Sequence, residues 1–340
     1  CEIMKNDSLV SIQDVVKHFD ISGGLLEQFK FKQGRIRRQQ SIVRAVNSVS
    51  FDIKRGETVS VVGESGCGKS TLARAVIRLY PLNSGQVLYD QTRIDNLSGA
   101  EIKPFRSKMQ MVFQDPYASL NPRMSVFETL VEPIKFHNSG INKSEAEDRV
   151  ASVMKQVGVD PDWSTRYPHE FSGGQRQRIS IARALAVDPE FIVADEPIAA
   201  LDVSIQAQIL NLLMDLQNER KLTYMFISHD LSVVEHISTN VAVMYLGTLC
   251  EFAETETLFN NPRHPYTRAL LSAIPQIGRK DFDHIKLEGD VPTPINLPTG
   301  CVFHGRCPYA DKRCSEEVPN QIILDDDTQV ACHGVQEGRI

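Results

Sequence analysis

The sequence predicts an α/β fold with a mixed sheet at its core. Three observations lead to this expectation. A short apolar strand runs into a glycine-rich turn and then a helix, other apolar runs of strand length alternate with helix-like segments, and cysteines gather near the C-terminal end. At 340 residues the chain exceeds one typical domain, so we expect a large domain with an appendage. We place the large domain at residues 1–275 and a Cys-rich extension at 276–340.

The composition is that of a soluble, globular chain, with 41% hydrophobic and 24% charged residues. No apolar run approaches the roughly 18 residues that span a bilayer, and no signal peptide precedes the first strand, so a membrane role is expected to come through partners. The net charge of −6 predicts no general affinity for nucleic acid. We interpret one basic stretch as a solvated insertion, with a docking patch for a partner or lipid headgroups as the alternative: Lys30, Lys32, Arg35, Arg37, Arg38 and Arg44.

An antiparallel β subdomain is predicted up to about residue 95. Residues 9–17 partly alternate between apolar and polar and predict an edge strand that leads to Phe19, and residues 45–53 alternate as a second strand. The core strands are short, apolar and rich in β-branched or aromatic residues. They are expected at 59–62, 109–113, 191–194, 223–227 and 241–245.

A helical subdomain is expected as an insertion in the sheet domain at about residues 116–185. Prolines precede its helix-like stretches at 125–136, 143–157 and 174–187. A further helical segment is predicted at 255–275, followed by loops rich in Pro, Gly and Cys. The chain has no internal repeat of about 20–50 residues, so it carries one copy of its core unit.

The turn after the strand at 59–62 matches the phosphate-binding pattern G-x-x-x-x-G-K-[ST] in its required context. Its glycines allow the backbone to bend around an anion, and the next helix adds the positive end of its dipole. We expect Lys69 to reach the β- and γ-phosphates of a nucleotide and Ser70 to offer its hydroxyl to Mg²⁺. The nucleotide-binding residues are predicted to be Gly63, Glu64, Ser65, Gly66, Cys67, Gly68, Lys69, Ser70 and Thr71.

Two carboxylates follow the apolar strand at 191–194. Asp195 is predicted to hold Mg²⁺ through water, and Glu196 to polarise the attacking water. Paired acids after a strand also fit a helix cap and its neighbour. The phosphate-binding loop upstream favours the catalytic interpretation.

Residues 171–175, Phe-Ser-Gly-Gly-Gln, open a predicted helix. Ser172 is a candidate N-cap, and Gly173 and Gly174 leave N–H groups open to a second anion, with Gln175 completing the motif. This pentapeptide resembles the signature sequence of the ATP-binding subunits of ABC transporters, with Phe171 in place of the usual Leu. The resemblance implies an ABC-type P-loop NTPase fold.

The same resemblance implies roles for four more residues. Gln114 matches the loop glutamine that senses Mg²⁺ and the transmembrane partner, and Asp202 lies in the loop that crosses a dimer interface. His229 matches the switch histidine that contacts the γ-phosphate, so the implied catalytic residues include it with Glu196 and the lysine of the loop. Phe19 lies where the family has an adenine-stacking aromatic. The implied dimer is head-to-tail, with two ATP molecules sandwiched between subunits.

Residues 114–123, and the His264-Pro265-Tyr266 run within 261–271, resemble the ATPases of oligopeptide and dipeptide importers. This implies a second, identical or related ATPase subunit, two transmembrane permeases and an extracytoplasmic peptide-binding protein at the cytoplasmic face of a prokaryotic membrane. The alternatives are an importer ATPase for nickel or another small solute, a soluble ABC ATPase acting on ribosomes or DNA, and a silent partner subunit that binds ATP structurally.

Four of the seven cysteines lie in the tail: Cys301, Cys307, Cys314 and Cys332. Four thiolates can surround one centre, but the spacing lacks the tight C-x2-C pair of zinc sites and matches no ferredoxin pattern. The family resemblance implies a four-iron four-sulfur cluster, with zinc or unliganded thiols as the alternatives. Because the tail is far in sequence from the phosphate site, we expect a structural or regulatory role for it.

Overall fold

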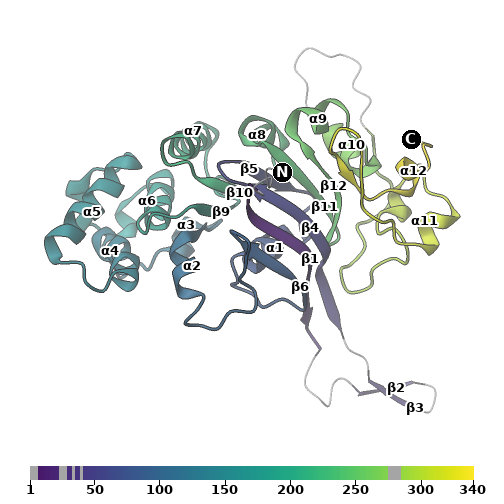
Figure 1. The fold of residues 1–340 in the computed structure, drawn as a ribbon, viewed down its shortest axis with the longest axis horizontal. Helices are drawn as coiled ribbons and strands as arrows, with labels where there is room; N and C mark the ends of the chain where they lie inside the picture. Colours follow the sequence, from purple (N-terminus) through teal and green to yellow (C-terminus); the bar gives the residue numbers. More distant parts are fainter. Residues whose placement is uncertain (1–6, 23–28, 33–34, 39–40, 275–284) are drawn as a thin grey trace, which may run out of the picture. The chain divides into compact units, whose positions relative to one another are not determined.

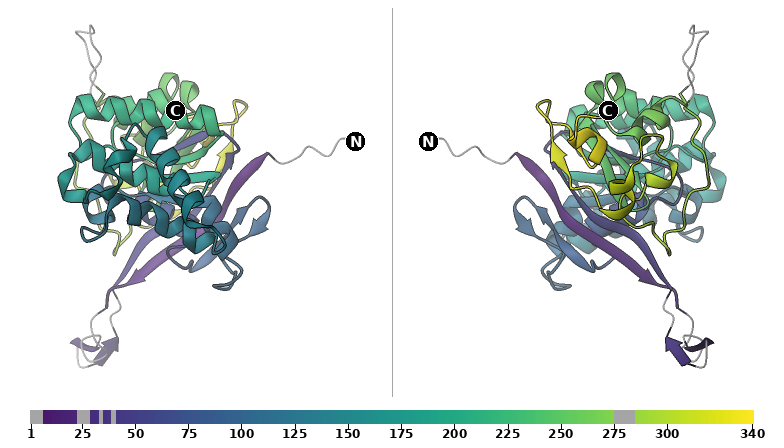
Figure 2. Two further views of the ribbon diagram at one scale, coloured as in Figure 1. Left: turned by 90° about the vertical axis from the view of Figure 1, so that its left-hand side faces the viewer. Right: turned by 90° about the vertical axis from the view of Figure 1, so that its right-hand side faces the viewer.

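The computed structural model of the chain describes residues 7–22, 29–32, 35–38, 41–274 and 285–340. Figures 1 and 2 show the path of the chain. It folds into two compact units, each assembled from separate stretches of sequence. The first unit takes residues 1–9, 53–60 and 96–228, and the second takes 10–52, 61–95 and 229–340. The predicted division at residue 275 stays a prediction.

A four-stranded antiparallel sheet belongs chiefly to the second unit, with the order β4-β1-β6-β7. Val10 of β1 lies opposite Tyr89 of β6, and both side chains are fully buried. The alternation read from the sequence thus places one face of β1 in the core, and the predicted antiparallel sheet is confirmed. The prediction of an edge strand was wrong, because β1 lies between β4 and β6. The strands are β1 (Ser8–Asp20), β4 (Ile42–Lys54), β6 (Ser84–Tyr89) and β7 (Thr92–Arg93).

A short antiparallel hairpin forms within the basic stretch. Its strands are β2 (Phe29–Lys32) and β3 (Arg35–Arg38), with Phe29 opposite Arg38. The side chains of residues 23–40 lie outside the described part of the chain. The interpretation of this stretch as a solvated insertion or a docking patch therefore stays a prediction.

Parallel strands form the core of the first unit, in the order β5-β10-β9-β8. Every residue of β5, β9 and β10 is buried, as expected for a parallel sheet covered on both faces. Neighbouring parallel strands end at the same edge, so Asp195 pairs with Ile227 there. The strands are β5 (Thr58–Val62), β8 (Met109–Val112), β9 (Phe191–Asp195) and β10 (Thr223–Ile227).

Several helices of the first unit begin at residues whose side chains cap them. Ser125 and Glu128 form a reciprocal capping box at α4, and Asn142 and Glu145 form another at α5. The three predicted helices are confirmed within two residues at each end, although the boundaries of the predicted subdomain at 116–185 are not tested. The elements are α2 (Lys103–Lys108), α3 (Pro116–Ser119), α4 (Val126–His137), α5 (Lys143–Gln156), η1 (Pro161–Thr165), η2 (Pro168–Glu170), α6 (Gly173–Leu185) and α7 (Val203–Arg220).

The second unit contains strands in the order β13-β14-β12-β11. Its helices include two that correct the prediction of one helical segment at 255–275. The segment breaks after α9 because Pro262 follows the helix end and His264 caps a new helix with Pro265 in its first turn. The elements are α1 (Lys69–Val76), α8 (Leu231–Ile237), β11 (Asn240–Tyr245), β12 (Thr248–Glu254), α9 (Thr255–Asn260) and α10 (Pro265–Leu271).

The C-terminal tail contains more regular structure than the predicted loops. Its strand β14 pairs with β12 antiparallel, with Val330 opposite Glu251. Strands of two residues carry no readable period, so their pairing depends on the edge that β12 offers. The elements are η3 (His304–Arg306), α11 (Lys312–Glu316), β13 (Ile322–Ile323), β14 (Gln329–Val330) and α12 (His333–Gln336).

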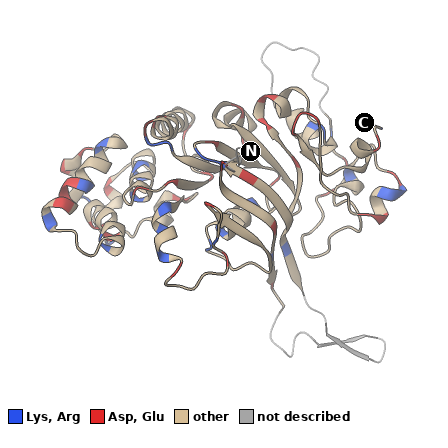
Figure 3. Cartoon of the chain, in the orientation of Figure 1, with Lys and Arg blue, Asp and Glu red and all other residues tan. Residues whose placement is uncertain are grey.

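Acidic and basic residues follow one another along α5 and α11 (Figure 3). On α5, Lys143 pairs with Glu147 one turn later, and on α11 Lys312 pairs with Glu316 in the same way. Such exposed pairs contribute little stability individually, about 0.3–0.5 kcal/mol.

The described helices include none that combines the length and the apolar character required to cross a bilayer.

Candidate nucleotide-binding site

The phosphate-binding loop lies between β5 and α1, as the sequence predicts. Gly68 stands at the N-cap of α1 with a φ of 105°, a conformation that disfavours side chains. A Cβ on this residue would lie 2.0 Å from the carbonyl oxygen of Ala45. Only glycine therefore lets the loop pass so close to β4 before the helix begins.

Lys69 is held inside the curve of the loop. Its side chain is buried, with 6% of the residue exposed, and Nζ donates to the carbonyl oxygens of Gly63 at 2.8 Å and Glu64 at 3.1 Å. Cys67 is also buried, and burial raises the pKa of its thiol, so the thiol stays neutral near pH 7. The ammonium group is thus the cation that the structure places in the loop.

Two residues from the C-terminal part of the chain contact this loop. The hydroxyl of Tyr266 accepts a hydrogen bond from the N–H of Glu64 at 2.9 Å, and Arg306 forms an ion pair with the carboxylate of Glu64 at 2.9 Å. The sequence predicts a structural or regulatory role for the tail, because the tail is far in sequence from the phosphate site. No local signal could have identified these contacts, because 242 positions separate Arg306 from Glu64.

Three predicted residues meet at the ends of β8 and β9 in the first unit. Asp195 is fully buried as the last residue of β9. Glu196 follows with a φ of 47°, and its N–H donates to the carbonyl oxygen of Ile227 at 3.1 Å. Gln114 donates from Nε2 to Oε2 of Glu196 at 3.0 Å. The amide of Gln114 is therefore in contact with the carboxylate that the sequence assigns to water activation.

Two other predicted nucleotide-site residues belong to the second unit. His229 is exposed and comes just before α8, whose N-cap is Asp230. Phe19 is half-buried near the end of β1, and its ring meets Tyr80 edge-on at 5.3 Å between centroids. The ammonium of Lys17 lies 4.8 Å from the centre of the same ring. The assigned roles of His229 and Phe19 stay predictions.

The signature pentapeptide begins α6 with its polar end exposed. The hydroxyl oxygen of Ser172 accepts a hydrogen bond from the N–H of Gln175 at 3.3 Å. In return, Oε1 of Gln175 accepts a hydrogen bond from the N–H of Ser172 at 2.9 Å. A Cβ on Gly174 would lie 2.5 Å from Cγ2 of Ile205 on α7, so this glycine allows the two helices to approach closely. Asp202 is exposed at the N-cap of α7.

The four tail cysteines lie near one another without forming a site for a single ion. The N–H of Cys301 donates to the carbonyl oxygen of Cys314 at 2.8 Å. Burial, with smaller contributions from the thiols of Cys332, Cys314 and Cys307, raises the pKa of Cys301 to about 11. Within the described ranges, no three His, Cys, Asp or Glu side chains form a group that could hold a metal ion. The geometry therefore gives no direct support to the predicted cluster or to zinc.

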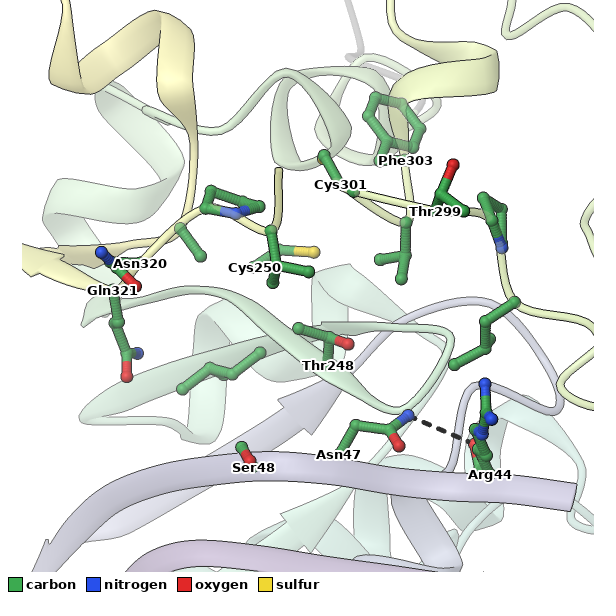
Figure 4. Close-up of a pocket in the computed structure, with 18 of the residues that line it drawn as sticks. Arg44, Asn47, Ser48, Thr248, Cys250, Thr299, Cys301, Phe303, Asn320 and Gln321 are labelled. Atoms are coloured by element: carbon green, nitrogen blue, oxygen red, sulfur yellow. Dashed lines mark hydrogen bonds between the residues drawn. The ribbon is translucent and has the colours of Figure 1, made fainter. Parts of the chain in front are cut away.

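A cavity of about 690 Å³ separates part of the tail from β4 and β12 (Figure 4). Arg44 and Asn47 line it from β4, Cys250 from β12, and Cys301 and Phe303 from the tail. The amide of Asn47 donates to the carbonyl oxygen of Arg44 at 3.4 Å. The cavity thus brings one tail cysteine, Cys301, to the same space as the buried Cys250 of the sheet.

A buried histidine caps α10. Nδ1 of His264 accepts a hydrogen bond from the N–H of Tyr266 at 3.0 Å, and the N–H of His264 donates to the carboxylate of Glu251 at 2.9 Å. Burial, assisted by the charge of Arg268, lowers the pKa of His264 to about 3. Burial raises the pKa of Glu251. The imidazole is therefore neutral in the folded protein across the physiological range.

The protein should lose stability on mild acidification through His264. In the unfolded chain His264 is protonated below about pH 6.5, whereas in the folded chain it stays neutral down to about pH 3. Between these pH values the free energy of unfolding therefore falls by up to about 1.4 kcal/mol for each unit by which the pH is lowered. Denaturant unfolding at pH 6.5 and pH 5 measures this slope. His264→Asn keeps a capping side chain and should show a shallower slope. Glu251 contributes an opposite slope in both proteins, so equal slopes for the two would contradict the assignment to His264.

Comparison with known proteins agrees with this architecture. A family described as ABC transporter matches residues 46–199, and one described as Oligopeptide/dipeptide transporter, C-terminal region, matches residues 250–314. Among solved structures, the dimeric post-hydrolysis state of the ATP-binding cassette MJ0796 bound to ADP and Pi superposes with a TM-score of 0.61 at 29% identity, covering 72% of this chain and 98% of that one. The predicted fold class is thus confirmed.

Curated relatives match over almost the whole chain. It is 49% identical over 331 residues to the oligopeptide transport ATP-binding protein AppF of Bacillus subtilis strain 168, covering 96% of this chain and 97% of that one. It is 46% identical over 332 residues to the di/tripeptide transport ATP-binding protein DppF of Pseudomonas aeruginosa strain UCBPP-PA14, covering 97% and 99%. With both family regions in the expected order, the chain belongs to the ABC transporter family, among its oligopeptide and dipeptide transporter ATP-binding proteins.

Proposed function

We propose that this chain is the ATP-hydrolysing subunit of a membrane importer for oligopeptides or dipeptides. The observation that carries this proposal is the near full-length similarity to peptide transport ATP-binding proteins in a chain with a complete phosphate-binding loop. The C-terminal match, at residues 250–314, favours peptide transport over ABC ATPases in general.

The reaction is in-line attack of water on the γ-phosphate of ATP. Lys69 supplies the cation at the β- and γ-phosphates, and Ser70 and Asp195 would hold Mg²⁺. Bound Mg²⁺ neutralises charge that develops on the phosphate oxygens. Glu196 accepts a proton from the attacking water, and the amide of Gln114, 3.0 Å from its carboxylate, orients it. His229 contacts the γ-phosphate, and Phe19 stacks on the adenine.

The ATP site is completed by a second ATPase subunit, identical or related. The exposed N-terminus of α6, with Ser172 at its cap and Gly173 beside it, forms the opposite wall for the partner's ATP. Gly174 and Gln175 shape this end, and Asp202 contacts the interface. Related solved structures are of a dimeric ATP-binding cassette, MJ0796, which supports this arrangement.

Two transmembrane permeases and an extracytoplasmic peptide-binding protein complete the importer. The chain reaches the cytoplasmic face of the membrane through the permeases. Tyr117 of α3 is 57% exposed and follows Gln114 closely in sequence. An exposed aromatic beside the predicted sensor of the permease is suited to a protein interface.

Reconstitution of the whole importer in vesicles tests this function. The complex should hydrolyse ATP faster when its binding protein carries a peptide, and labelled di- or oligopeptide should accumulate only with ATP. Uptake of nickel or another small solute instead of peptide would overturn the substrate, while retaining the ATPase. ATPase activity that needs no permease would overturn the transport function.

The finer part of the proposal is a four-iron four-sulfur cluster on the tail cysteines. The donor set fits, because four thiolates are its ordinary ligands, and the neighbouring thiols influence the pKa of Cys301. The lack of a single-ion group among the described residues weighs more against zinc, because a larger cluster holds its ligands further apart. The proposed ligands are Cys301, Cys307, Cys314 and Cys332.

Protein purified without oxygen should contain about four iron and four acid-labile sulfide per chain. Cys314→Ser should lower both together, because it removes one thiolate ligand. Cys250→Ser is the matched control, since Cys250 is buried on β12 outside the proposed ligand set. Stoichiometric zinc with no iron, or neither metal, would contradict the cluster.

A further inference from the structure

The tail fastens onto the side chain of one residue of the phosphate-binding loop. Nη1 of Arg306 donates to both carboxylate oxygens of Glu64, at 3.1 Å and 2.9 Å. The Arg306 side chain is 10% exposed and that of Glu64 is 25% exposed. A charged hydrogen bond sheltered to this degree is stronger than an exposed ion pair. It therefore restrains where the Glu64 carboxylate can lie.

The main chain of the same residue is held by Tyr266. Its hydroxyl accepts the N–H of Glu64 at 2.9 Å, and its fully buried ring lies 5.3 Å from that of Phe303. Phe303 in turn accepts the N–H of Arg306 on its carbonyl oxygen at 2.9 Å. Tyr266 and Arg306, which both hold Glu64, are thus connected through Phe303. Nη1 of Arg306 also donates a hydrogen bond to the hydroxyl of Tyr245 at 3.4 Å.

The negative charge of the Glu64 carboxylate disfavours phosphate binding in the loop that contains it. A phosphate bound in the curve of the loop would be repelled by a neighbouring negative charge, and partial burial weakens screening by water. Lys69 contacts Glu64 only at its main-chain oxygen, 3.1 Å from Nζ. Arg306 is the residue that meets the carboxylate itself and offsets its charge.

We propose that Arg306 and Tyr266 are positioning residues for ATP, through which the tail neutralises Glu64 and keeps the phosphate-binding loop in its binding shape. The inference rests on the proposed function, in which this loop holds ATP. It makes ATP affinity dependent on a segment more than two hundred positions away in sequence.

A second interpretation is that the pair merely anchors the tail. The two interpretations agree that loss of Arg306 is harmful and differ on the role of Glu64. If Arg306 acts by offsetting the charge of Glu64, removing that charge makes Arg306 nearly dispensable. If it only anchors the tail, removing both partners is at least as harmful as removing one.

The test measures Mg-ATP affinity, KM and kcat of the full-length chain in its complex. Arg306→Gln should weaken ATP binding about tenfold and raise KM equally, with kcat changed less than about twofold. Glu64→Gln should tighten binding about threefold, because it removes a repulsive charge. Adding Arg306→Gln to Glu64→Gln should then cost less than about threefold. A tenfold loss in both backgrounds, or in neither, would overturn the proposal.

Tyr266→Phe provides a second test that preserves the aromatic packing and hence the fold. It removes only the acceptor for the N–H of Glu64 and should weaken ATP binding about threefold to fivefold. Arg313→Gln is the matched control, because Arg313 pairs with Glu317 and Glu337 in an exposed part of the tail. Loss of affinity in this control, or none in Tyr266→Phe, contradicts the proposal. Failure of the wild-type protein to bind ATP would instead refute the proposed function.

Discussion

Glu196→Gln lowers the rate of ATP hydrolysis by the assembled importer by about two to four orders of magnitude and leaves ATP binding intact. The substitution removes the proton acceptor and keeps the shape of the side chain. The new amide oxygen can still accept the hydrogen bond that Gln114 now donates at 3.0 Å. Phosphate release and nucleotide binding, measured on the same preparation, separate the chemical step from affinity.

Glu190→Gln is the matched control for this variant. Glu190 directly precedes β9, whereas Glu196 directly follows it, and its carboxylate pairs with Arg55 at 3.0 Å and Lys108 at 2.9 Å. These ion pairs are partly exposed, so their loss should cost little stability and leave hydrolysis near the wild-type rate. Hydrolysis by Glu196→Gln at the wild-type rate would show that another group accepts the proton.

Lys69→Met should weaken ATP binding by about two orders of magnitude, because it removes the only buried ammonium that the described part of the loop contains. Methionine retains a linear apolar side chain, so the loop can remain packed. Isothermal titration with Mg-ATP measures the affinity directly. The thermal stabilisation by ATP, roughly 4 °C at a concentration of 100 times the wild-type Kd, should disappear.

Lys54→Met controls for the loss of a positive charge from the chain. The Lys54 side chain is 62% exposed and its nearest partner is Glu57 at 4.0 Å, so this variant should bind ATP like the wild type. The melting temperature without nucleotide shows whether Lys69→Met is folded. A folded Lys69→Met protein that binds ATP normally would remove Lys69 from the proposed nucleotide site.

The core strands and most helices could be predicted because their signals are local. All residues of β9 and β10 are buried, and most of them are apolar. A short run of apolar residues in the sequence therefore predicts each strand. Ser125 and Glu128, three positions apart, form a capping pattern that predicts the start of α4. The predicted helix at 255–275 was wrong in its middle because its prolines and the His264 cap outweigh the helical pattern around them.

The site residues differ in how well sequence patterns could predict their positions and contacts. The order of β5, the loop and α1 makes the position of Lys69 predictable, since neighbouring residues impose it. The contact of Gln114 with Glu196 follows from the parallel pairing of β8 with β9, which ends both strands at one edge of the sheet. The resemblance to a known family supplied the expectation that these residues act together.

Local patterns along the chain thus specify the phosphate-binding loop itself: glycines that allow its path, a lysine inside its curve and a helix that begins at its end. Folding alone brings Tyr266 and Arg306 onto Glu64, and it alone places β14 along β12. These contacts join residues far apart in the chain, and their strength comes from burial and charge pairing that exist only once the surrounding core has formed. Local periodicity carries no record of such pairings, and the packed structure decides them.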